Sequence, residues 1–504
     1  MIRAPRTLAL TALWLPLAAC VHSSVPAGGT LPDDGIVSHP DQLTFPVVDY
    51  QPPRASEHRM VLANGSVCYM AEHSFVPLVR IEATIRTDRD REPEGLTGLN
   101  GAFFSQLAEG GGGGLAPAEF EDRVAFLGAR FWSRPTEYGG VVGIELLSKD
   151  LNQGLDLLFG QLVSPGFDQA RLDLWREQTL ASLRQRNDDT RRLERLEWNR
   201  LIYPPTVSEG RFVTQADLDR ITRDALLDWQ RRWVAPAGIS FEVSGDVTRN
   251  AVLTALDRHF ETWQAACEPV PERDAEYSAA TPGVYLLDKE VNQTRVRLAL
   301  PGLHRDDSRW VAGEVLNTIL GGGFTSRLVS RIRSDEGLAY SVWSSLGEEN
   351  HGTGLFLGGM QTKVESTLYA MALYKEELQR LAGGDLENDE LERVRLGMIE
   401  EFPGNFNSPA NIVARLHDEE LSGRYASDPA WFASYRDRVA AVDRDAVISL
   451  AREMLDTDRL IWLLIGDTKV IEAGDSEHGL KLEDFGPVTR IPLRDPLSQL
   501  PLEG

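Results

Sequence analysis

Arg333 and Tyr340 stand seven positions apart and are the residues of this sequence best suited to act on a carbonyl group. A guanidinium and a phenol both donate hydrogen bonds. Two such donors aimed at one carbonyl oxygen stabilise the negative charge that develops there when a peptide bond is attacked. The same two residues also fit a solvated helix end and a half-buried strand aromatic, and on chemistry alone this second interpretation is favoured.

The residues around the pair predict a turn, a helix and a strand. Gly321–Gly323 form the turn, Ser326 is a good helix N-cap, and Gly337 ends the helix. Apolar residues recur between them at helical spacing, at Leu328, Val329 and Ile332. A strand is predicted over Leu338–Ser345, so the guanidinium lies near the helix end and the phenol early in the strand.

This run resembles the C-terminal-domain signature of the M16 zinc metallopeptidases (the insulinase/pitrilysin and mitochondrial processing peptidase-like family). Its signature has a Gly-rich turn, then Ser-Arg-Leu, then an arginine and a tyrosine seven apart, and the resemblance extends from about His58 to Asp467. The resemblance implies that Arg333 and Tyr340 contact substrate near the zinc. It also implies substrate-binding positions at Gly321, Gly322 and Gly323.

In active members of that family the first long helix carries His-x-x-Glu-His, which binds zinc and activates water. Alignment on Gly98-Leu99 places Gly101 and Ser105 at the two histidines and Phe104 at the glutamate. Ser182 takes the position of the third zinc ligand. Glu177 lies nearby and is expected to be solvated. The resemblance therefore implies a non-catalytic member with no metal or cofactor of its own, whose zinc is held by a partner subunit.

No other catalytic or metal motif is apparent in the sequence. None of the nine histidines pairs with another at metal-ligand spacing, and no Gly-x-Ser-x-Gly motif occurs. Neither Cys68 nor Cys267 has a neighbouring base. His417-Asp418-Glu419-Glu420 is polar, and a single histidine among acidic residues predicts a solvated helix surface.

The order of predicted elements occurs twice along the chain. Val243-Ser-Gly-Asp246 and Leu464-Ile-Gly-Asp467 close equivalent halves. The predicted fold class is α+β, with two duplicated halves that are each a mostly antiparallel sheet with helices packed on one side, as in M16 and LuxS-like metallohydrolases. The predicted segments are a signal peptide (1–19), a lipidated Pro/Gly-rich tether (20–54), an N-terminal domain (55–266), a linker (267–282), a C-terminal domain (283–490) and a tail (491–504).

The N-terminus predicts export. Arg3 and Arg6 precede the apolar run Leu8–Leu17, and Leu17-Ala-Ala-Cys20 resembles a bacterial lipobox. Cleavage there and lipidation of Cys20 would anchor the chain in the periplasm, and Val21 resembles lipoproteins sent to the outer membrane. An ordinary signal peptide with a chance cysteine is the alternative. The run is too short for a transmembrane helix.

Composition limits the partners. The formal charge of −24 becomes −26 once the two arginines of the signal peptide are removed, so bulk charge does not favour nucleic acid or anionic lipid. An exported chain permits a disulfide, and the sequence leaves open whether Cys68 and Cys267 pair, although free buried thiols are favoured. The five-glycine run Gly110–Gly114 is either a hinge or, more simply, a spacer.

The resemblance favours a non-catalytic subunit of a heterodimeric periplasmic M16 zinc peptidase, which supplies Arg333 and Tyr340 to the zinc site of a His-x-x-Glu-His partner. Unfolded peptides are the expected substrates, and activity is expected only in the complex. The alternative is a lipoprotein of the cell envelope that binds peptides or serves as a scaffold, without enzymatic activity.

Overall fold

The computed structural model describes residues 50–263, 265–270, 280–347 and 354–502. The predicted signal peptide, the lipidation site Cys20 and nearly all of the tether lie outside these residues, as does part of the predicted linker. The chain divides into two units, Met1–Tyr50 and Gln51–Gly504, and the helices and strands named below all belong to the second. In the described part, no helix combines the length and apolar character that a membrane span requires.

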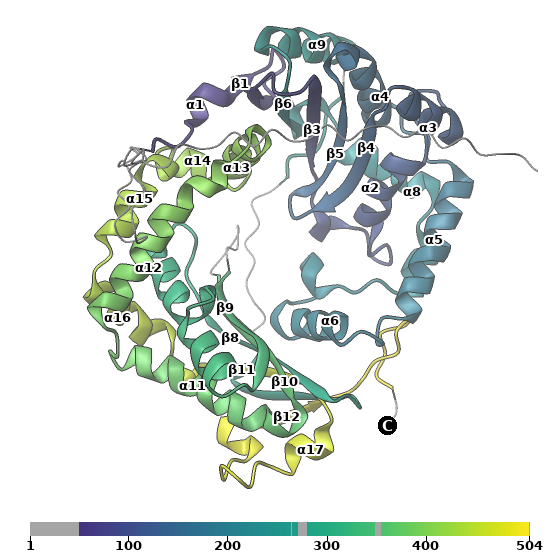
Figure 1. Ribbon diagram of the computed structural model, residues 1–504. Coiled ribbons are helices and arrows are strands. Elements are labelled where there is room, and N and C mark those ends of the chain that lie inside the picture. Colours follow the sequence, from purple (N-terminus) through teal and green to yellow (C-terminus); the bar gives the residue numbers. More distant parts are fainter. Residues whose placement is uncertain (1–49, 264, 271–279, 348–353, 503–504) are drawn as a thin grey trace, which may run out of the picture. The chain divides into compact units, whose positions relative to one another are not determined.

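The N-terminal half contains a six-stranded sheet (Figure 1) with the order β1-β2-β6-β3-β5-β4. Only β2 and β6 pair in parallel. A hairpin turn at Asn64-Gly65 joins β1 to β2, and Gly65 adopts the left-handed conformation that this turn requires (φ 87°). The strands are β1 (Arg59–Val61), β2 (Val67–Glu72), β3 (Leu78–Arg86), β4 (Arg130–Thr136), β5 (Gly139–Leu147) and β6 (Ile239–Gly245).

The C-terminal half repeats this arrangement with the order β12-β7-β11-β8-β10-β9. The two sheets correspond strand for strand except at one edge, where β12 from the end of the chain pairs in parallel with β7. The predicted duplication and the mostly antiparallel sheets are therefore confirmed. The strands are β7 (Gly283–Asp288), β8 (Gln293–Pro301), β9 (Ala339–Leu346), β10 (Leu355–Lys363), β11 (Ile461–Gly466) and β12 (Val488–Ile491).

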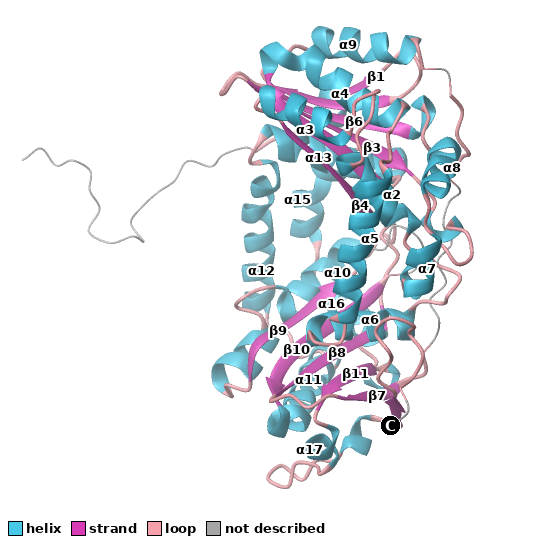
Figure 2. Ribbon diagram, turned by 90° about the vertical axis from the view of Figure 1, so that its right-hand side faces the viewer, coloured by secondary structure: helices cyan, strands magenta, loops and turns pink. Residues whose placement is uncertain are grey.

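Each half packs helices of its own against one face of its sheet (Figure 2) and buries a separate hydrophobic core there. The N-terminal half has α1 (Ala55–His58), α2 (Leu99–Glu109), α3 (Pro117–Phe126), α4 (Leu151–Val163), α5 (Gln169–Arg184), α6 (Thr190–Ile202), α7 (Gln215–Arg220), α8 (Arg223–Trp233) and α9 (Arg249–Glu261). The C-terminal half has α10 (Trp310–Asn317), α11 (Thr367–Ala382), α12 (Asn388–Glu401), α13 (Pro409–Leu421), α14 (Arg424–Ser427), α15 (Trp431–Ala441), α16 (Arg444–Met454) and α17 (Thr468–Glu472).

The second face of each sheet receives one helix from the other half. Helix α6 packs on β8 and β11, where its Trp198 and Ile202 join a buried apolar cluster with Leu463. Helix α13 packs on β2 and β6 and meets the strand positions that alternate with the core residues. The two halves are therefore tied together by a reciprocal exchange of helices, which the sequence does not predict.

The predicted tail also contributes to the fold. Beyond β12, the backbone of Leu497 accepts a hydrogen bond from the amide of Gln215 at the start of α7, and the side chain of Arg200 donates to Gln499. The segment runs from the C-terminal sheet to helices of the N-terminal half and adds a second connection between them.

Candidate functional site

A short helix and an edge strand position the predicted pair. Arg333 lies in a π-helical segment, Val329–Asp335, that continues the turn begun at Arg327. π-helical segments are rare and often occur at functional sites. Gly337 follows in the left-handed conformation (φ 65°) and turns the chain into β9, as predicted from its type. Ser326 is buried, and its hydroxyl has no hydrogen-bond partner in the described part of the chain, so it does not act as the predicted cap.

Arg333 lies between two exposed aromatic rings. Its guanidinium carbon is 5.0 Å from the ring centre of Tyr340 and 4.7 Å from that of Phe324. The two rings are 84% and 76% exposed. Cation–π contacts of this kind fix the plane of a guanidinium and leave its N–H edge free. The structure thus brings Arg333 and Tyr340 together and adds Phe324, which sequence reasoning missed although it directly follows the three glycines.

A β-bulge sets the direction of the Tyr340 side chain. Ser341 pairs with Gln361 and Ala339 with Thr362, so Tyr340 has no partner on β10. Ala339 and Val342 are both buried in the core, which a regular two-residue alternation would not allow for positions three apart. The bulge gives the core the small Ala339 and turns the phenol outward. Tyr340 is therefore not the half-buried aromatic of the simpler interpretation.

The pair is chemically available. Neither the guanidinium of Arg333 nor the hydroxyl of Tyr340 makes a hydrogen bond or an ion pair with another described residue. Both groups can therefore donate to an oxygen atom brought by another molecule. A carbonyl oxygen or an oxyanion placed beside both side chains would accept hydrogen bonds from the Arg333 guanidinium and from the Tyr340 hydroxyl.

The glycines before the pair have separate explanations. A Cβ on Gly321 would lie 2.5 Å from the amide nitrogen of Ser344, and one on Gly322 would lie 2.9 Å from Asn317 Nδ2. These two glycines are needed for close packing against β9 and the preceding helix. A Cβ on Gly323 would meet nothing within 4 Å. The substrate-binding role of the three glycines stays a prediction.

The positions aligned with the zinc ligands do not fit a metal ion. On α2, Phe104 is 0% exposed, and its ring fills the space beside Gly140, where a Cβ would lie 2.4 Å from it. Gly101 and Ser105 offer no imidazole. On α5, the hydroxyl and the carbonyl of Ser182 accept hydrogen bonds from Arg192, and Glu177 is exposed as expected.

The described residues contain no group of three or more histidine, cysteine, aspartate or glutamate side chains that could hold a metal ion. A zinc ion bound through α2 would therefore lack both its histidine ligands and its general base.

The prediction of a solvated surface at His417–Glu420 is wrong. His417 is 0% exposed; its Nδ1 lies 2.8 Å from Glu242 Oε1 and its Nε2 lies 2.7 Å from Ser240 Oγ, both on β6. Glu420 receives two hydrogen bonds from Arg59 and one from Tyr69. The polar residues of α13 thus bind the N-terminal sheet. Their partners lie far away in the sequence, so the local pattern resembles a solvated face.

Burial and hydrogen bonding act on Glu420 in opposite directions. Burial by itself would raise the pKa of this carboxyl, but the hydrogen bonds from Arg59 and Tyr69 outweigh it, and the net pKa lies below the ordinary value of 4.5. The Glu420 carboxylate therefore stays charged at neutral pH and bound to Arg59 of β1 and Tyr69 of β2.

The two cysteines of the folded part are free thiols. Cys68 is fully buried on β2, and burial raises the pKa of its thiol. Cys267 is partly exposed. The favoured prediction of free thiols is confirmed, although only one of the two is buried.

The five-glycine loop packs against other elements and is not a plain spacer. Gly112 bridges to Leu115 and Pro165, and a Cβ on Gly113 would lie 3.1 Å from the Cα of Gly160 on α4.

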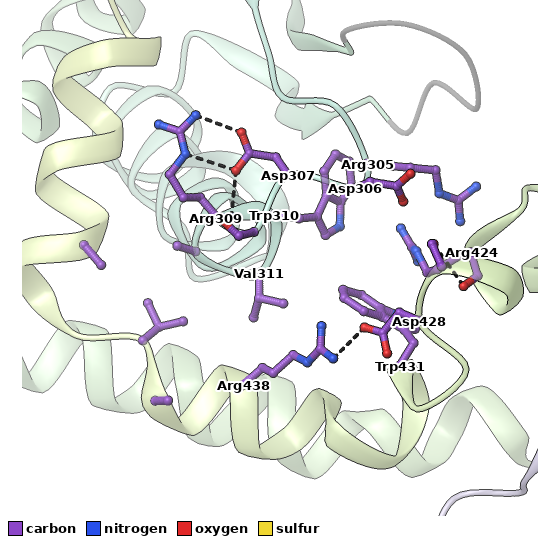
Figure 3. A pocket seen from close by; sticks show the side chains of 16 residues that line it. Arg305, Asp306, Asp307, Arg309, Trp310, Val311, Arg424, Asp428, Trp431 and Arg438 are labelled. Atoms are coloured by element: carbon purple, nitrogen blue, oxygen red, sulfur yellow. Dashed lines mark hydrogen bonds and ion pairs between the residues drawn. The ribbon is translucent and has the colours of Figure 1, made fainter. Parts of the chain in front are cut away.

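A cavity of about 470 Å³ lies in the C-terminal half between the start of α10 and α14–α16 (Figure 3). Its arginines are paired with carboxylates. Arg309 donates to Asp307, Arg438 donates to Asp428, and Arg424 donates to Glu419 and stacks on Trp431. None of the predicted site residues lines this cavity. The arginines at its wall are paired with carboxylates of this chain.

The chain is similar in sequence to peptidase-like proteins and to their inactive homologues. A family model described as "Peptidase M16 inactive domain" matches residues 220–398. The Uncharacterized zinc protease SCO5738 of Streptomyces coelicolor is 30% identical over 247 residues, which are 47% of this chain and 52% of that protein. The Non-peptidase homolog YmxG of Helicobacter pylori is 25% identical over 269 residues, which are 52% of this chain and 60% of that protein. The chain spans about half the length of the curated relatives it matches.

Solved structures share the fold. A peptidase M16 inactive domain from Pseudomonas fluorescens superposes with a TM-score of 0.71 at 19% identity, covering 81% of this chain and 97% of that one. A protease from Helicobacter pylori gives 0.69 at 17% identity over 83% of this chain and 100% of that one. The periplasmic protease PqqL from Escherichia coli gives 0.69 at 15% identity over 88% and 48%.

Proposed function

We propose that the chain is an inactive M16 peptidase homologue without the zinc motif, and that it serves as the non-catalytic, substrate-contacting subunit of a heterodimeric periplasmic M16 zinc peptidase. The observation that carries the proposal is the contrast between two sites. On α2 the buried Phe104 fills the position of the catalytic glutamate, and neither histidine position carries an imidazole, whereas Tyr340 is exposed and Arg333 is partly exposed beside it.

In this proposal the partner carries His-x-x-Glu-His and supplies a zinc ion that activates water. The residues of the present chain bind and orient the peptide. Arg333, held between Phe324 and Tyr340, donates to a carbonyl oxygen of the substrate backbone. The Tyr340 hydroxyl donates to the oxygen that gains negative charge as water attacks. Donors of this kind are most effective where water is excluded, as in an enclosed chamber.

The substrate class follows from the same family resemblance. Members of the family enclose a chamber between two pairs of halves, which admits unfolded peptides and excludes folded proteins. A lipid anchor at Cys20 would hold the complex at the membrane that faces the periplasm. The periplasmic PqqL protease, a structural neighbour, supports this compartment.

The proposal is tested by purifying the chain alone and together with a candidate partner that bears His-x-x-Glu-His. We expect one zinc ion per heterodimer by elemental analysis, none in the chain alone, and cleavage of unfolded peptides only by the mixture. Zinc in the isolated chain, or cleavage by it, would overturn the proposed division of labour.

A second candidate function is supported by the names of two relatives, a non-peptidase homolog and a probable inactive metalloprotease. In this case the chain binds peptides or serves as a scaffold without any cleavage. Peptide binding by the isolated chain, combined with no cleavage in the presence of any M16 partner from the same cell, would select this function over the first.

A further inference from the structure

An uncharged apolar loop projects from the N-terminal sheet between β2 and β3. Five consecutive residues, Ser74 to Leu78, are exposed, and four of them are apolar. The ring of Phe75 is 83% exposed and stacks on His73, with 5.4 Å between the ring centres. Leu147, which pairs with Leu78 on the neighbouring strand β5, extends this apolar surface. Single exposed apolar residues are common on proteins, whereas an uninterrupted exposed run of this kind usually serves binding.

Backbone hydrogen bonds hold both ends of the loop. The amide of His73 donates to the carbonyl oxygen of Gly245 on β6, at 2.9 Å. The amide of Ser148, just after β5, donates to the carbonyl oxygen of Pro77, at 3.0 Å. The apolar run is therefore fixed at this end of the sheet, where its side chains face water at a cost in free energy.

The folded part of the chain begins at the same end of the sheet. In the short helix α1, His58 Nδ1 lies 2.8 Å from the carbonyl oxygen of Met70 on β2. Arg249 joins the two segments again, because its guanidinium donates to the carbonyl oxygen of Glu57 (2.5 Å) and its amide donates to the Glu72 carboxylate (2.6 Å). The chain thus enters the fold beside the end of β2, from which the apolar loop emerges.

We propose that the Ser74–Leu78 loop inserts into a lipid bilayer and orients the N-terminal half on the membrane. The proposed acyl anchor at Cys20 precedes α1 in the chain and keeps a bilayer within reach of this end of the fold. An anchor raises the effective concentration of the chain at the membrane, so that a weak second contact is occupied. This contact goes beyond the proposed function and takes from it only the membrane location.

The size and the charge of the loop favour lipid over a protein partner. Four apolar residues on a loop present much less than the area of about 800 Å² that each partner buries in a stable protein complex. A bilayer interface accepts individual Phe and Leu side chains, and each contributes in proportion to its buried apolar area. The adjoining charged residues Glu72, Lys149 and Asp246 are of both signs, so the loop suits zwitterionic headgroups better than anionic ones.

The test places an environment-sensitive dye on the loop. Phe75→Cys is labelled with a nitrobenzoxadiazole group in a Cys267→Ser background, in which the remaining Cys68 is fully buried and unreactive. A histidine tag in place of residues 1–20 anchors the chain to phosphatidylcholine–phosphatidylethanolamine vesicles that contain a nickel-chelating lipid. We expect the dye emission to move to shorter wavelength, because the dye leaves water. A dye at Phe126→Cys, an equally exposed site on α3, should show no such change.

A second measurement needs no anchor. The full chain with Cys20→Ser cannot be acylated, and its partition coefficient into the same vesicles without the chelating lipid is measured by sedimentation. We expect Phe75→Ser to lower this coefficient by about 10-fold or more, since an apolar ring no longer enters the bilayer. Phe126→Ser, the matched control, should leave it unchanged.

Two results would overturn the proposal. One is the absence of an emission change at position 75, or equal changes at positions 75 and 126. The other is a change at position 75 that requires an added envelope protein instead of lipid, which would identify a protein interface. The mass of the natural N-terminal peptide reports acylation separately, so a missing acyl group would contradict the proposed anchor and not this contact.

Discussion

The two halves of the molecule share one strand order but use their aromatic residues in opposite ways. In the N-terminal half, Phe104 is 0% exposed on α2 and fills the space beside Gly140. In the C-terminal half, Phe324 and Tyr340 are largely exposed and hold Arg333 between them. Burial stabilises the first arrangement, whereas exposed aromatic rings gain little from it. The comparison indicates that core packing has taken the glutamate position of one site, whereas the other site still presents its aromatic rings for binding.

The exchanged helices show a second contrast. Helix α6 covers the C-terminal sheet mainly with apolar side chains, such as Trp198 and Ile202. Helix α13 covers the N-terminal sheet with His417 and Glu420, which bind polar groups of β1, β2 and β6. Both contacts combine burial with polar pairs, because Glu194 of α6 pairs with Arg295 and Arg297 and α13 also buries Val413 and Leu416. They differ in that α13 adds a fully buried histidine, which is bonded to two residues of β6.

The largest effect on stability is expected from Phe104→Ala. Removing a fully buried phenylalanine leaves a cavity beside Gly140 and should lower the free energy of unfolding by about 3–5 kcal/mol. Urea denaturation of the purified chain measures this loss. The matched Phe324→Ala exchange at an exposed ring should change the same quantity by about 0.5 kcal/mol or less. Equal losses at both positions would contradict the contrast between the two sites.

A smaller loss is expected from His417→Ala. The change leaves Glu242 and Ser240 without their partner on α13, and hydrogen bonds to charged groups contribute about 1.5–3 kcal/mol when buried. Because Glu242 is partly exposed, we expect a decrease of about 1–2 kcal/mol in the free energy of unfolding. His304→Ala, at an exposed histidine, is the control and should have almost no effect. An unchanged stability of the first variant would show that α13 does not depend on its polar contacts.

The pH dependence of stability tests the polar contacts of α13. The pKa of Glu420 is lower in the folded chain than its ordinary value of 4.5, so the stability it provides is present above about pH 4.5 and is lost as pH falls through its folded pKa. Glu420→Gln should therefore remove part of the decline in unfolding free energy below pH 4.5, while leaving its slope near pH 7 unchanged. If the unfolding free energies of variant and wild type changed with pH in parallel throughout the acid range, the Glu420 carboxylate would make no such contribution.

The smallest effect is expected from Phe324→Ala on the cleavage rate of the proposed complex. Phe324→Ala removes one of the two rings that hold Arg333, and an exposed cation–π contact contributes about 0.5–1 kcal/mol. We expect kcat/KM for an unfolded peptide to fall by a factor of about 2–5 with the fold intact. Phe126→Ala, an equally exposed phenylalanine on α3, is the control. A similar decrease in both variants would mean that Phe324 has no specific role.

Local signals in the sequence predict much of the fold. The Asn64-Gly65 hairpin, the turn at Gly337 and the repeated strand order follow from residue types whose backbone preferences act over a few positions. Between α7 and α8 the chain is interrupted at Ile221-Thr222, where the side chain of Thr222 caps the second helix, a local signal of the same kind.

The features that the sequence does not predict depend on distant contacts. The burial of His417 is set by Ser240 and Glu242, which are more than 170 positions away, so its acidic neighbours resemble a solvated face. The outward direction of Tyr340 comes from a one-residue bulge against β10, which no local pattern reveals. The spacing of Arg333 and Tyr340 nevertheless places them together, because a short helix, a glycine and a strand connect them.

The central claim is tested most directly by the cleavage rate of the complex carrying Tyr340→Phe in this chain. The substitution keeps the ring over Arg333 and removes only the hydroxyl. If that hydroxyl stabilises the developing oxyanion, kcat should fall by about 10²–10³-fold with zinc content unchanged. Tyr285→Phe, on β7 of the same sheet, is the matched control and should cleave at the wild-type rate. A Tyr340→Phe complex that cleaves as fast as wild type would contradict the account.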